Sequence, residues 1–433
     1  MRYLYSAAYY CLVPLLVVRM LWRSRRMPSY RQRMAERFGL FPARDQLGRP
    51  AIWVHAVSMG EVQAALPLLQ GLLREHPEQP LVVTTTTPTG SERVRELLGE
   101  KVFHVYLPWD LPGAISRFLQ RTRPCLLLVM ETELWPNMLC LSRTQGCRIA
   151  LINGRMSEQS ARGYARFPRF TSMLLDNLDV AACQTSADGE RLLKLGLPAA
   201  RLAITGSLKF DIQITEEWRE QVQQLRQSLS LQQSGTTAAR ERMVVVVAST
   251  HSREESLLLS AFDAIKASLN DCVLVLVPRH PERFEEVYKL CRRTPWVIAR
   301  RSFTSKLGMD TDILLVDTVG ELAMVLGIAS VAVIGGSFYG HGGHNPLEAA
   351  AWGVPMLSGP DMFNFEDVSQ QLESTGALLR LANASELADQ MLELLQDEPR
   401  RRRMGASALD ALERNSGVVD SVMELIEGLM QRS

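Results

Sequence analysis

The sequence predicts an α/β protein with two Rossmann-like domains facing each other across a cleft, preceded by an N-terminal membrane-anchor helix. Three observations lead to this prediction. In both halves of the chain, short apolar segments typical of buried strands alternate with helix-length amphipathic segments. A polar, Gln-rich stretch at residues 221–240 separates the halves, and an uncharged, largely apolar stretch at residues 3–18 precedes them. Repeated alternation of strand and helix implies parallel sheets covered on both faces.

The composition fits a folded protein of more than one domain. The chain has 433 residues, of which 46% are hydrophobic and 22% charged, so a disordered chain, collagen and a coiled coil are poor fits. The 48 basic residues nearly balance the 47 acidic ones, which argues against general attraction to nucleic acid. The 7 cysteines include no C-x-x-C pair and are expected to be reduced thiols in the cytoplasm.

The apolar N-terminal segment is short for a membrane span. Residues 3–18 are followed by Arg19 and then by three more apolar residues, whereas a bilayer-spanning helix needs about 20. A spanning helix with a snorkelling Arg19 and an interfacial, monotopic helix therefore both remain open. A cleaved signal peptide is disfavoured because basic residues crowd the C-terminal side of the segment and no small-x-small cleavage site follows.

A cluster of arginines follows the apolar segment, with Glu36 as its only acid. By the positive-inside rule, this cluster predicts a single N-terminal anchor in the inner (cytoplasmic) membrane, with the body of the protein on the cytoplasmic face. The same arginines fit equally well as contacts to anionic headgroups or to the phosphates of a lipid substrate. The cluster comprises Arg19, Arg23, Arg25, Arg26, Arg31, Arg33 and Arg37.

The alternating pattern places the domain boundaries. Expected strands of the first half are residues 51–56, 81–85, 126–130, 148–152 and 180–183, and those of the second half are residues 243–248, 272–277, 313–316, 331–334 and 354–357. We expect an anchor and basic segment at 1–27, an N-terminal domain at 28–220, a linker at 221–240, and a C-terminal domain with terminal helices at 241–433. Ligands of such sheets bind beyond the carboxyl ends of the strands.

Glu61 is the first candidate catalytic residue. It follows the strand at 51–56 and opens an amphipathic helix, so its carboxylate is expected at the cleft, where it can accept a proton from a hydroxyl. Ser58-x-x-Glu61 is also the pattern of a capping box, in which Glu61 only folds back on the backbone. The stretch from Thr89 to Glu92 has the same pattern. Spacing alone favours the cap over catalysis.

Two acids, Glu131 and Glu133, follow the apolar strand at 126–130. A buried carboxylate at a strand end is costly unless it is paired, and chemistry is slightly favoured for Glu131, with Glu133 undecided. Lys209 lies in the segment that closes the first half and could neutralise a phosphate or a carboxylate. Most lysines are simply solvated, and from the pattern alone Lys209 is read that way.

The second half contains a candidate nucleotide site. A glycine-rich segment, residues 335–343, follows an expected strand, and Asn345-Pro346 then opens an expected helix, which directs N–H groups and a positive helix end toward an anion. Glu348 is a candidate for ribose hydroxyls and Arg279 for phosphate or base. No metal is expected, because Asp310 and Asp312 precede a strand and His341 and His344 lack further ligands.

Taken together, these segments resemble the transferases of 3-deoxy-D-manno-octulosonic acid (Kdo). The motifs that carry this resemblance are spread over the whole chain. They are Ser58-Met59-Gly60-Glu61, residues 86–93, residues 130–137, residues 205–211, residues 278–284 and residues 342–350. The family is similar to GT-B glycosyltransferases, uses CMP-Kdo as donor and lipid A precursor (lipid IVA) as acceptor, and needs neither a metal nor another cofactor.

The resemblance also implies roles for individual residues. Glu61 matches the general base of an inverting transfer, and Glu131 and Lys209 match the transition-state stabilisers. The residues that match CMP contacts are Pro278, Arg279, Val319, Gly320, Glu321, Asn345, Pro346, Leu347 and Glu348. The sequence departs from the family pattern at Val319 and at residues 338–341. Two alternatives stand beside this reading: another GT-B transferase or epimerase that uses a UDP-sugar, and an inert, membrane-tethered nucleotide-binding protein.

Overall fold

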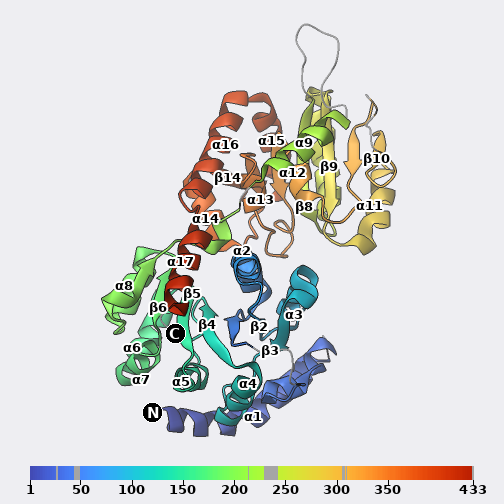
Figure 1. Cartoon of the computed structure of the whole chain (residues 1–433). Coiled ribbons are helices and arrows are strands. Elements are labelled where there is room, and N and C mark those ends of the chain that lie inside the picture. The colour runs from blue at the N-terminus through green and yellow to red at the C-terminus, as the bar shows by residue number, and fades with distance from the viewer. Residues whose placement is uncertain are drawn as a thin grey trace. The chain divides into compact units, whose positions relative to one another are not determined.

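The computed structural model describes residues 1–25, 28–42, 49–212, 214–228, 242–304, 308 and 310–431. The chain forms two compact units (Figure 1). The first consists of Met1–Asp211 together with Gly417–Ser433, and the second of Ile212–Ser416. Each unit is an α/β domain built on one parallel sheet of seven strands.

The sheet of the first unit has the strand order β3-β2-β1-β4-β5-β6-β7, and every neighbouring pair is parallel. The chain order reverses between β1 and β4, so these two adjacent strands form the switch point of the sheet, where ligands bind in open α/β folds. The strands are β1 (Ala51–His55), β2 (Leu81–Thr85), β3 (Phe103–Tyr106), β4 (Pro124–Met130), β5 (Arg148–Gly154), β6 (Val180–Cys183) and β7 (Leu202–Ile204).

Helices cover both faces of this sheet. The α-helices of the first unit are α1 (Arg2–Arg23), α2 (Met59–Glu75), α3 (Pro88–Leu98), α4 (Pro112–Thr122), α5 (Pro136–Thr144), α6 (Glu158–Ala165), α7 (Pro168–Leu175), α8 (Ser186–Lys194) and α17 (Val418–Met430). The 3-10 helices are η1 (Pro28–Arg31), η2 (Met34–Phe38), η3 (Gly99–Lys101), η4 (Ala199–Arg201) and η5 (Leu208–Phe210).

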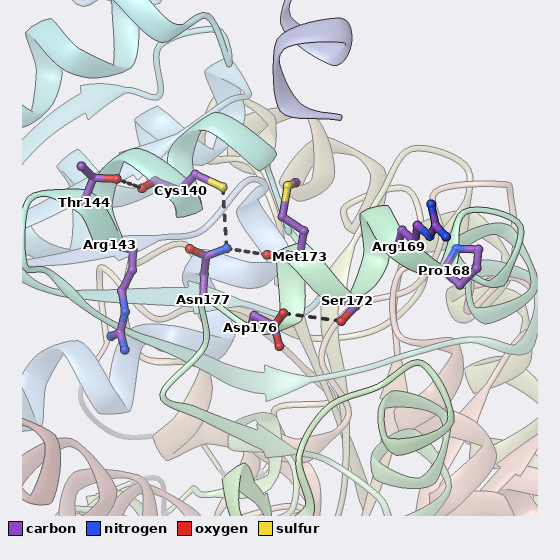
Figure 2. A pocket seen from close by; sticks show the side chains of 9 residues that line it. All are labelled: Cys140, Arg143, Thr144, Pro168, Arg169, Ser172, Met173, Asp176 and Asn177. Atoms are coloured by element: carbon purple, nitrogen blue, oxygen red, sulfur yellow. Dashed lines mark hydrogen bonds between the residues drawn. The ribbon is translucent and has the colours of Figure 1, made fainter.

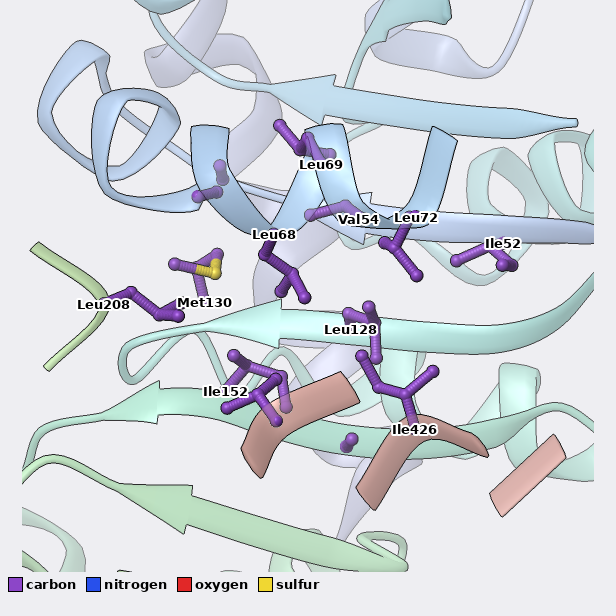
Figure 3. Close-up of a cluster of buried hydrophobic side chains, with 14 of the residues drawn as sticks. Ile52, Val54, Leu68, Leu69, Leu72, Leu128, Met130, Ile152, Leu208 and Ile426 are labelled. Carbon is purple, nitrogen blue, oxygen red and sulfur yellow. The ribbon is translucent and has the colours of Figure 1, made fainter. Parts of the chain in front are cut away.

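Successive residues of β1 point to opposite faces and feed two separate cores. Ile52 and Val54 pack with α2, α3 and α17, whereas Ala51 and Trp53 pack with α4, α5, α7 and α8. Figure 3 shows the first of these cores, in which leucines of α2 and Ile426 of α17 meet the strands. The strands are therefore apolar on both faces, as their uninterrupted hydrophobic runs predict.

The second unit repeats the design with the order β10-β11-β9-β8-β12-β13-β14, again parallel, and its switch point lies between β8 and β12. Its strands are β8 (Met243–Thr250), β9 (Cys272–Pro278), β10 (Ile298–Arg300), β11 (Ile313–Leu315), β12 (Val331–Ile334), β13 (Met356–Ser358) and β14 (Leu378–Arg380). Its helices are α9 (Glu216–Ser228), α10 (Glu254–Ser268), η6 (Pro281–Arg283), α11 (Phe284–Cys291), α12 (Leu322–Leu326), α13 (Leu347–Ala350), α14 (Glu366–Ser374), η7 (Ala384–Glu386), α15 (Leu387–Gln396) and α16 (Glu398–Glu413).

The units differ from the expected domains at two places. The expected linker begins inside α9, whose Val222 and Leu225 are buried and which contacts α12; residues 229–240 of that linker lie outside the described residues, as do Arg26 and Met27. The C-terminal helix α17, expected in the second domain, belongs to the first unit, because its apolar side is buried against α2 and β5.

The N-terminal helix α1 is long and apolar enough to cross a membrane, the only such helix in the described part of the chain. One side of it packs on the rest of the first unit: the Ser6 hydroxyl is hydrogen-bonded to the Asn137 amide of α5, with Ser6 Oγ 3.0 Å from Asn137 Nδ2. The ring of Tyr5 lies 6.0 Å from that of Phe170 of α7. The opposite side is exposed and apolar, with Leu4, Leu15, Val18 and Trp22 at helical spacing.

Candidate functional site

In the first unit, the predicted acids come together at the switch point of the sheet. Glu61 follows β1, and Glu131 and Glu133 follow β4, which is the neighbour of β1. Carboxyl ends of parallel strands meet at one edge, so these side chains share that edge. The proximity is also electrostatic: the charges of Glu131 and Glu133 both raise the pKa of Glu61.

Glu61 folds back toward the start of α2 as the capping-box pattern predicts, but its carboxylate accepts the N–H of Val57 instead of that of the N-cap residue Ser58. Ser58 is the N-cap of α2, the Val57 N–H donates to Glu61 Oε2 at 2.8 Å, and the Ser58 hydroxyl donates to Oε1 at 2.9 Å. These two bonds lower the pKa of Glu61, but burial outweighs them and, with the neighbouring acids, raises it to about 7. A carboxylate with that pKa is suited to act as a general base near neutral pH.

The second stretch with this pattern, Thr89 to Glu92, does not form a cap. The N-cap of α3 is Thr87, whose hydroxyl accepts the Gly90 N–H, and Pro88 is the first residue of the helix. Glu92 lies beyond it and is exposed. The fixed φ of Pro88 selects the start of the helix, so Glu92 is not part of its N-terminal cap.

Glu131 and Lys209 form an ion pair. Lys209 Nζ lies 3.7 Å from Glu131 Oε1, and both side chains are about one-quarter exposed, so the pair is reachable by a ligand. Lys209 therefore has a charged partner, which the pattern alone did not indicate, and its role in the reaction stays a prediction. Glu131 has a left-handed backbone (φ 55°), which is rare outside glycine and concentrates at functional sites.

Glu133 is held inside the same loop. Its Oε2 accepts the indole N–H of Trp135 at 2.7 Å, and burial raises its pKa. Trp135 is the N-cap residue of α5. Glu133 thus has a structural partner, and its charge adds to the field that raises the pKa of Glu61.

In the second unit, the predicted nucleotide contacts follow strands of one sheet. Pro278 ends β9 and Arg279 follows it, exposed; Val319 and Gly320 follow β11, and Asn345 lies after β12. Since β11, β9, β8 and β12 are consecutive in the sheet, these segments lie along its carboxyl edge. Burial lowers the pKa of His344, and the charge of Arg279 lowers it further.

Two features of this edge differ from the sequence expectation. The helix opened by Asn345-Pro346 is α13, a single turn of four residues from Leu347 to Ala350, so it supplies little helix dipole. The Asn345 side chain accepts the Leu347 N–H at 3.2 Å, Leu347 is buried, and Glu348 sits within the same turn. Several N–H groups of the glycine-rich segment are already used within the protein, among them Gly343 to the Gly336 carbonyl at 2.8 Å.

Glu321 has partners of its own. Its carboxylate is bonded to the Arg301 guanidinium at 2.9 Å and to the Thr318 hydroxyl. Val319 is 78% exposed and Gly320 is left-handed (φ 89°). The turn of Val319 and Gly320 is therefore open to a ligand, while the bonds of Glu321 to Arg301 and Thr318 hold the residue that follows the turn in place.

The hollow drawn in Figure 2 lies elsewhere in the first unit and contains none of these residues. It has a volume of about 720 Å³ and lies between the C-terminal part of α5 and helix α7. Its lining residues are Cys140, Arg143, Thr144, Pro168, Arg169, Ser172, Met173, Asp176 and Asn177. Because α5 runs away from the carboxyl edge of β4, its last turn is remote from the acids at the switch point.

Comparisons with known proteins identify the family. Residues 32–212 match the family model described as 3-deoxy-D-manno-octulosonic-acid transferase (kdotransferase), and residues 231–410 match glycosyl transferases group 1. A curated 3-deoxy-D-manno-octulosonic acid transferase of Haemophilus influenzae is 34% identical over 433 residues, covering 100% of this chain and 99% of the relative. The chain belongs to the Kdo transferase family. A Bordetella pertussis member is 36% identical over 437 residues, covering 98% of this chain and 99% of its own.

Membership makes this Kdo transferase family chain a glycosyltransferase, with two Rossmann-like domains of the GT-B type. A solved UDP-GlcNAc 2-epimerase from Neisseria meningitidis bound to UDP-GlcNAc is 13% identical with a TM-score of 0.53. The match covers 88% of this chain and 100% of the epimerase chain. That likeness concerns the fold alone.

The sequence patterns missed the residues at the switch point of the second unit of this Kdo transferase. Buried Glu254, at the start of α10, accepts the N–H groups of His251 at 2.9 Å, Gly336 at 2.8 Å and Phe338 at 3.2 Å. It thereby joins the loop after β8 to the glycine-rich segment after β12. Glu255 is buried beside it and accepts Arg283 at 2.6 Å.

A histidine cluster lies at the same place. His251 Nε2 is 2.9 Å from His344 Nε2, and the His251 ring stacks on that of His341 at 4.2 Å. Burial lowers the pKa of His251 to about 4 and of His344 to about 3, so both are neutral near pH 7. The sequence pattern that could have pointed to this cluster and to Glu254 is Ser249-Thr250-His251 at the end of an expected strand, followed by Glu254 and Glu255 at the start of a helix.

Proposed function

We propose that this protein transfers Kdo from CMP-Kdo to the lipid A precursor, lipid IVA, and releases CMP during assembly of the inner core of lipopolysaccharide. The observation that carries the proposal is Glu61: a buried carboxylate with a pKa of about 7, beside the Lys209–Glu131 pair, in a chain of the Kdo transferase family. Glu61 is the proposed general base.

The reaction is an inverting displacement. Glu61 takes the proton from a sugar hydroxyl of the acceptor, the oxygen forms a bond to the anomeric carbon of Kdo, and the bond from that carbon to the CMP phosphate oxygen breaks. The proton remains on Glu61 and CMP leaves as a phosphate monoester. Lys209, held beside Glu131, stabilises the negative charge that develops, and no metal ion is needed for any step.

The second unit provides the donor site in this proposal. Arg279 contacts the phosphate or base, and the exposed turn of Val319 and Gly320 lies along the same edge. The Glu254 carboxylate keeps the glycine-rich segment in place for the donor through its bonds to Gly336 and Phe338. Asn345, Pro346, Leu347, Glu348, Glu321 and Pro278 complete the proposed CMP contacts.

Helix α1 is proposed to anchor the protein on the cytoplasmic face of the inner membrane as an interfacial helix. A spanning helix would have to withdraw Tyr5 and Ser6 from their contacts with Phe170 and Asn137. An in-plane helix keeps these contacts and offers its apolar side, which includes Leu15, to the lipid.

Nucleotide specificity tests the proposal against a UDP-sugar enzyme. In a thermal unfolding experiment on the full-length protein, CMP should raise the melting temperature and UDP at the same concentration should not. Incubation with CMP-Kdo and lipid IVA should then give a lipid heavier by Kdo. Stabilisation by UDP alone, without Kdo transfer, would support the UDP-sugar reading. CMP binding without transfer would support an inert nucleotide-binding protein.

A further inference from the structure

The segment that carries Lys209 reaches Glu131 from the far edge of the sheet. It follows β7, an edge strand, whereas Glu131 follows β4, and β6 and β5 lie between them. The chain from Thr205 to Ser207 must therefore cross the carboxyl ends of two strands before η5 begins at Leu208. Without a fixed point on the way, a flexible lysine would not keep one position beside Glu131.

Asn153 is that fixed point. It lies near the end of β5, it is 0% exposed, and its Oδ1 accepts the N–H of Leu208 at 3.1 Å. Leu208 immediately precedes Lys209 and is itself buried in the core drawn in Figure 3. The carbonyl of Asn153 in turn accepts the Gln184 amide at 3.0 Å. One buried side chain thus ties the segment of Lys209 to the centre of the sheet.

The backbone of Asn153 matches that of Glu131. Both have φ 55°, a left-handed conformation in which asparagine is several-fold enriched. The register pairs Met130 of β4 with Ile152 of β5, so Glu131 and Asn153 are the residues that follow this pair. The Glu131 N–H donates to the Ile152 carbonyl at 3.0 Å. A displacement of Asn153 would therefore disturb the positions of both partners of the ion pair.

The conformation at Asn153 is costly in another way. Within the part of the chain that the structure describes, its Nδ2 is buried without a hydrogen-bond partner. A buried donor without a partner destabilises the folded state. Only the acceptor atom of this amide has a partner, and that partner is the N–H next to Lys209.

We infer that Asn153 is a positioning residue for the transfer reaction: through the N–H of Leu208 it holds Lys209 beside Glu131. This inference rests on the proposed function, in which Lys209 stabilises the transition state. Asn153 itself is fully buried, so its role is to position other residues and not to contact the substrate.

Asn153→Gly tests the inference because glycine accepts the left-handed backbone, while the substitution removes the whole side chain and with it the oxygen that accepts the Leu208 N–H. We expect kcat to fall about 10- to 100-fold, with KM for CMP-Kdo within about twofold of the wild-type value. Thr122→Val is the matched control. It removes one buried hydrogen bond, from Thr122 Oγ1 to the Phe118 carbonyl at 2.9 Å, elsewhere in the same unit, and should leave kcat unchanged.

A double-mutant cycle with Lys209→Ala separates positioning from general destabilisation. If Asn153 acts through Lys209, Asn153→Gly should have no further effect on kcat in the Lys209→Ala background. Multiplicative losses would overturn the inference. Should the glycine variant fail to fold, Asn153→Asp enters the same cycle, since it keeps an acceptor oxygen, and any loss of kcat should again vanish in the Lys209→Ala background.

A second measurement does not depend on turnover. Limited acetylation followed by peptide mass spectrometry reports how accessible the Lys209 amine is, and the rate should rise in Asn153→Gly but not in Thr122→Val. An unchanged rate would show that Lys209 is held by something else, whether or not the protein transfers Kdo. Absence of Kdo transfer by the wild-type protein would contradict the proposed function, and the acetylation result would still decide whether Asn153 positions Lys209.

Discussion

Lys209 Nζ lies 3.7 Å from Glu131 Oε1, and Glu131 is one of the two acids whose charges add to the effect of burial in raising the pKa of Glu61. Three carboxylates share the switch point of the first sheet, and the charges of Glu131 and Glu133 raise the pKa of Glu61. Lys209 places a positive charge beside Glu131. The same ammonium group is the proposed stabiliser of the charge that develops on the reacting groups.

Removal of Lys209 should change both the height and the position of the pH–rate profile. In Lys209→Ala the charge of Glu131 is no longer balanced, so the pKa of Glu61 rises further and the acid limb of kcat/KM moves to higher pH. The plateau should fall about 100-fold. Lys194→Ala, which removes an exposed lysine of α8, is the control. A lower plateau with an unmoved limb would argue against the coupling.

The pKa of Glu61 also predicts a pH dependence of stability. The folded value of about 7 exceeds the unfolded value of 4.5, so the contribution of Glu61 is fully present below pH 4.5 and is lost as the pH rises through 7. The loss is about 3 kcal/mol. In Glu61→Gln this loss should be absent, and urea titrations at pH 5 and pH 8 measure it. Glu92→Gln, at the exposed acid of the similar pattern, should behave as wild type.

Helix α17 should contribute strongly to the stability of the first unit. Ile426 is fully buried between α17 and the sheet, and Asp211 Oδ2 accepts the Val419 N–H at 2.7 Å at the start of the helix. Ile426→Ala should lower the free energy of unfolding by about 2–5 kcal/mol in a denaturant titration. Glu424→Ala, on the exposed side of α17, should change it by less than about 0.5 kcal/mol. Equal effects of the two variants would mean that the helix is not packed this way.

The exposed side of α1 should bind lipid. Leu15→Glu with Val18→Glu places charge on that side and should abolish cosedimentation with vesicles of anionic phospholipid. Ser6→Ala removes the hydrogen bond to Asn137 and should leave vesicle binding intact. If the double variant still sediments with the vesicles, the lipid-binding surface lies elsewhere.

The central strands could be predicted from the sequence, and the edge strands could not. All expected strands correspond to strands in the sheets, because each is an apolar run buried on both faces. The missed strands β3, β7, β10 and β14 are the four edges of the two sheets. They have three or four residues each and are partly exposed, so they lack the continuous hydrophobic signal.

The site shows a similar division. Glu61 was found from its place after a strand, but its capping pattern favoured a structural role, and only the structure shows that this hydrogen-bonded carboxylate is also buried with a raised pKa. The partner of Lys209 could not be predicted from the local sequence pattern. Glu131 follows a different strand, and the ion pair forms only because the segment after β7 leads back across the sheet to η5. Asn153 and Glu254 act through backbone N–H groups of distant segments, and no local spacing encodes such contacts.

The most direct test of the central claim is a transfer assay with radiolabelled CMP-Kdo and lipid IVA, run with the wild-type protein and with Glu61→Gln. The wild-type protein should label the lipid. In the variant, turnover should fall about 100- to 10,000-fold while CMP still raises the melting temperature. Undiminished turnover in Glu61→Gln would contradict the role of Glu61 as general base and leave it only its hydrogen bonds to Val57 and Ser58 at the start of α2.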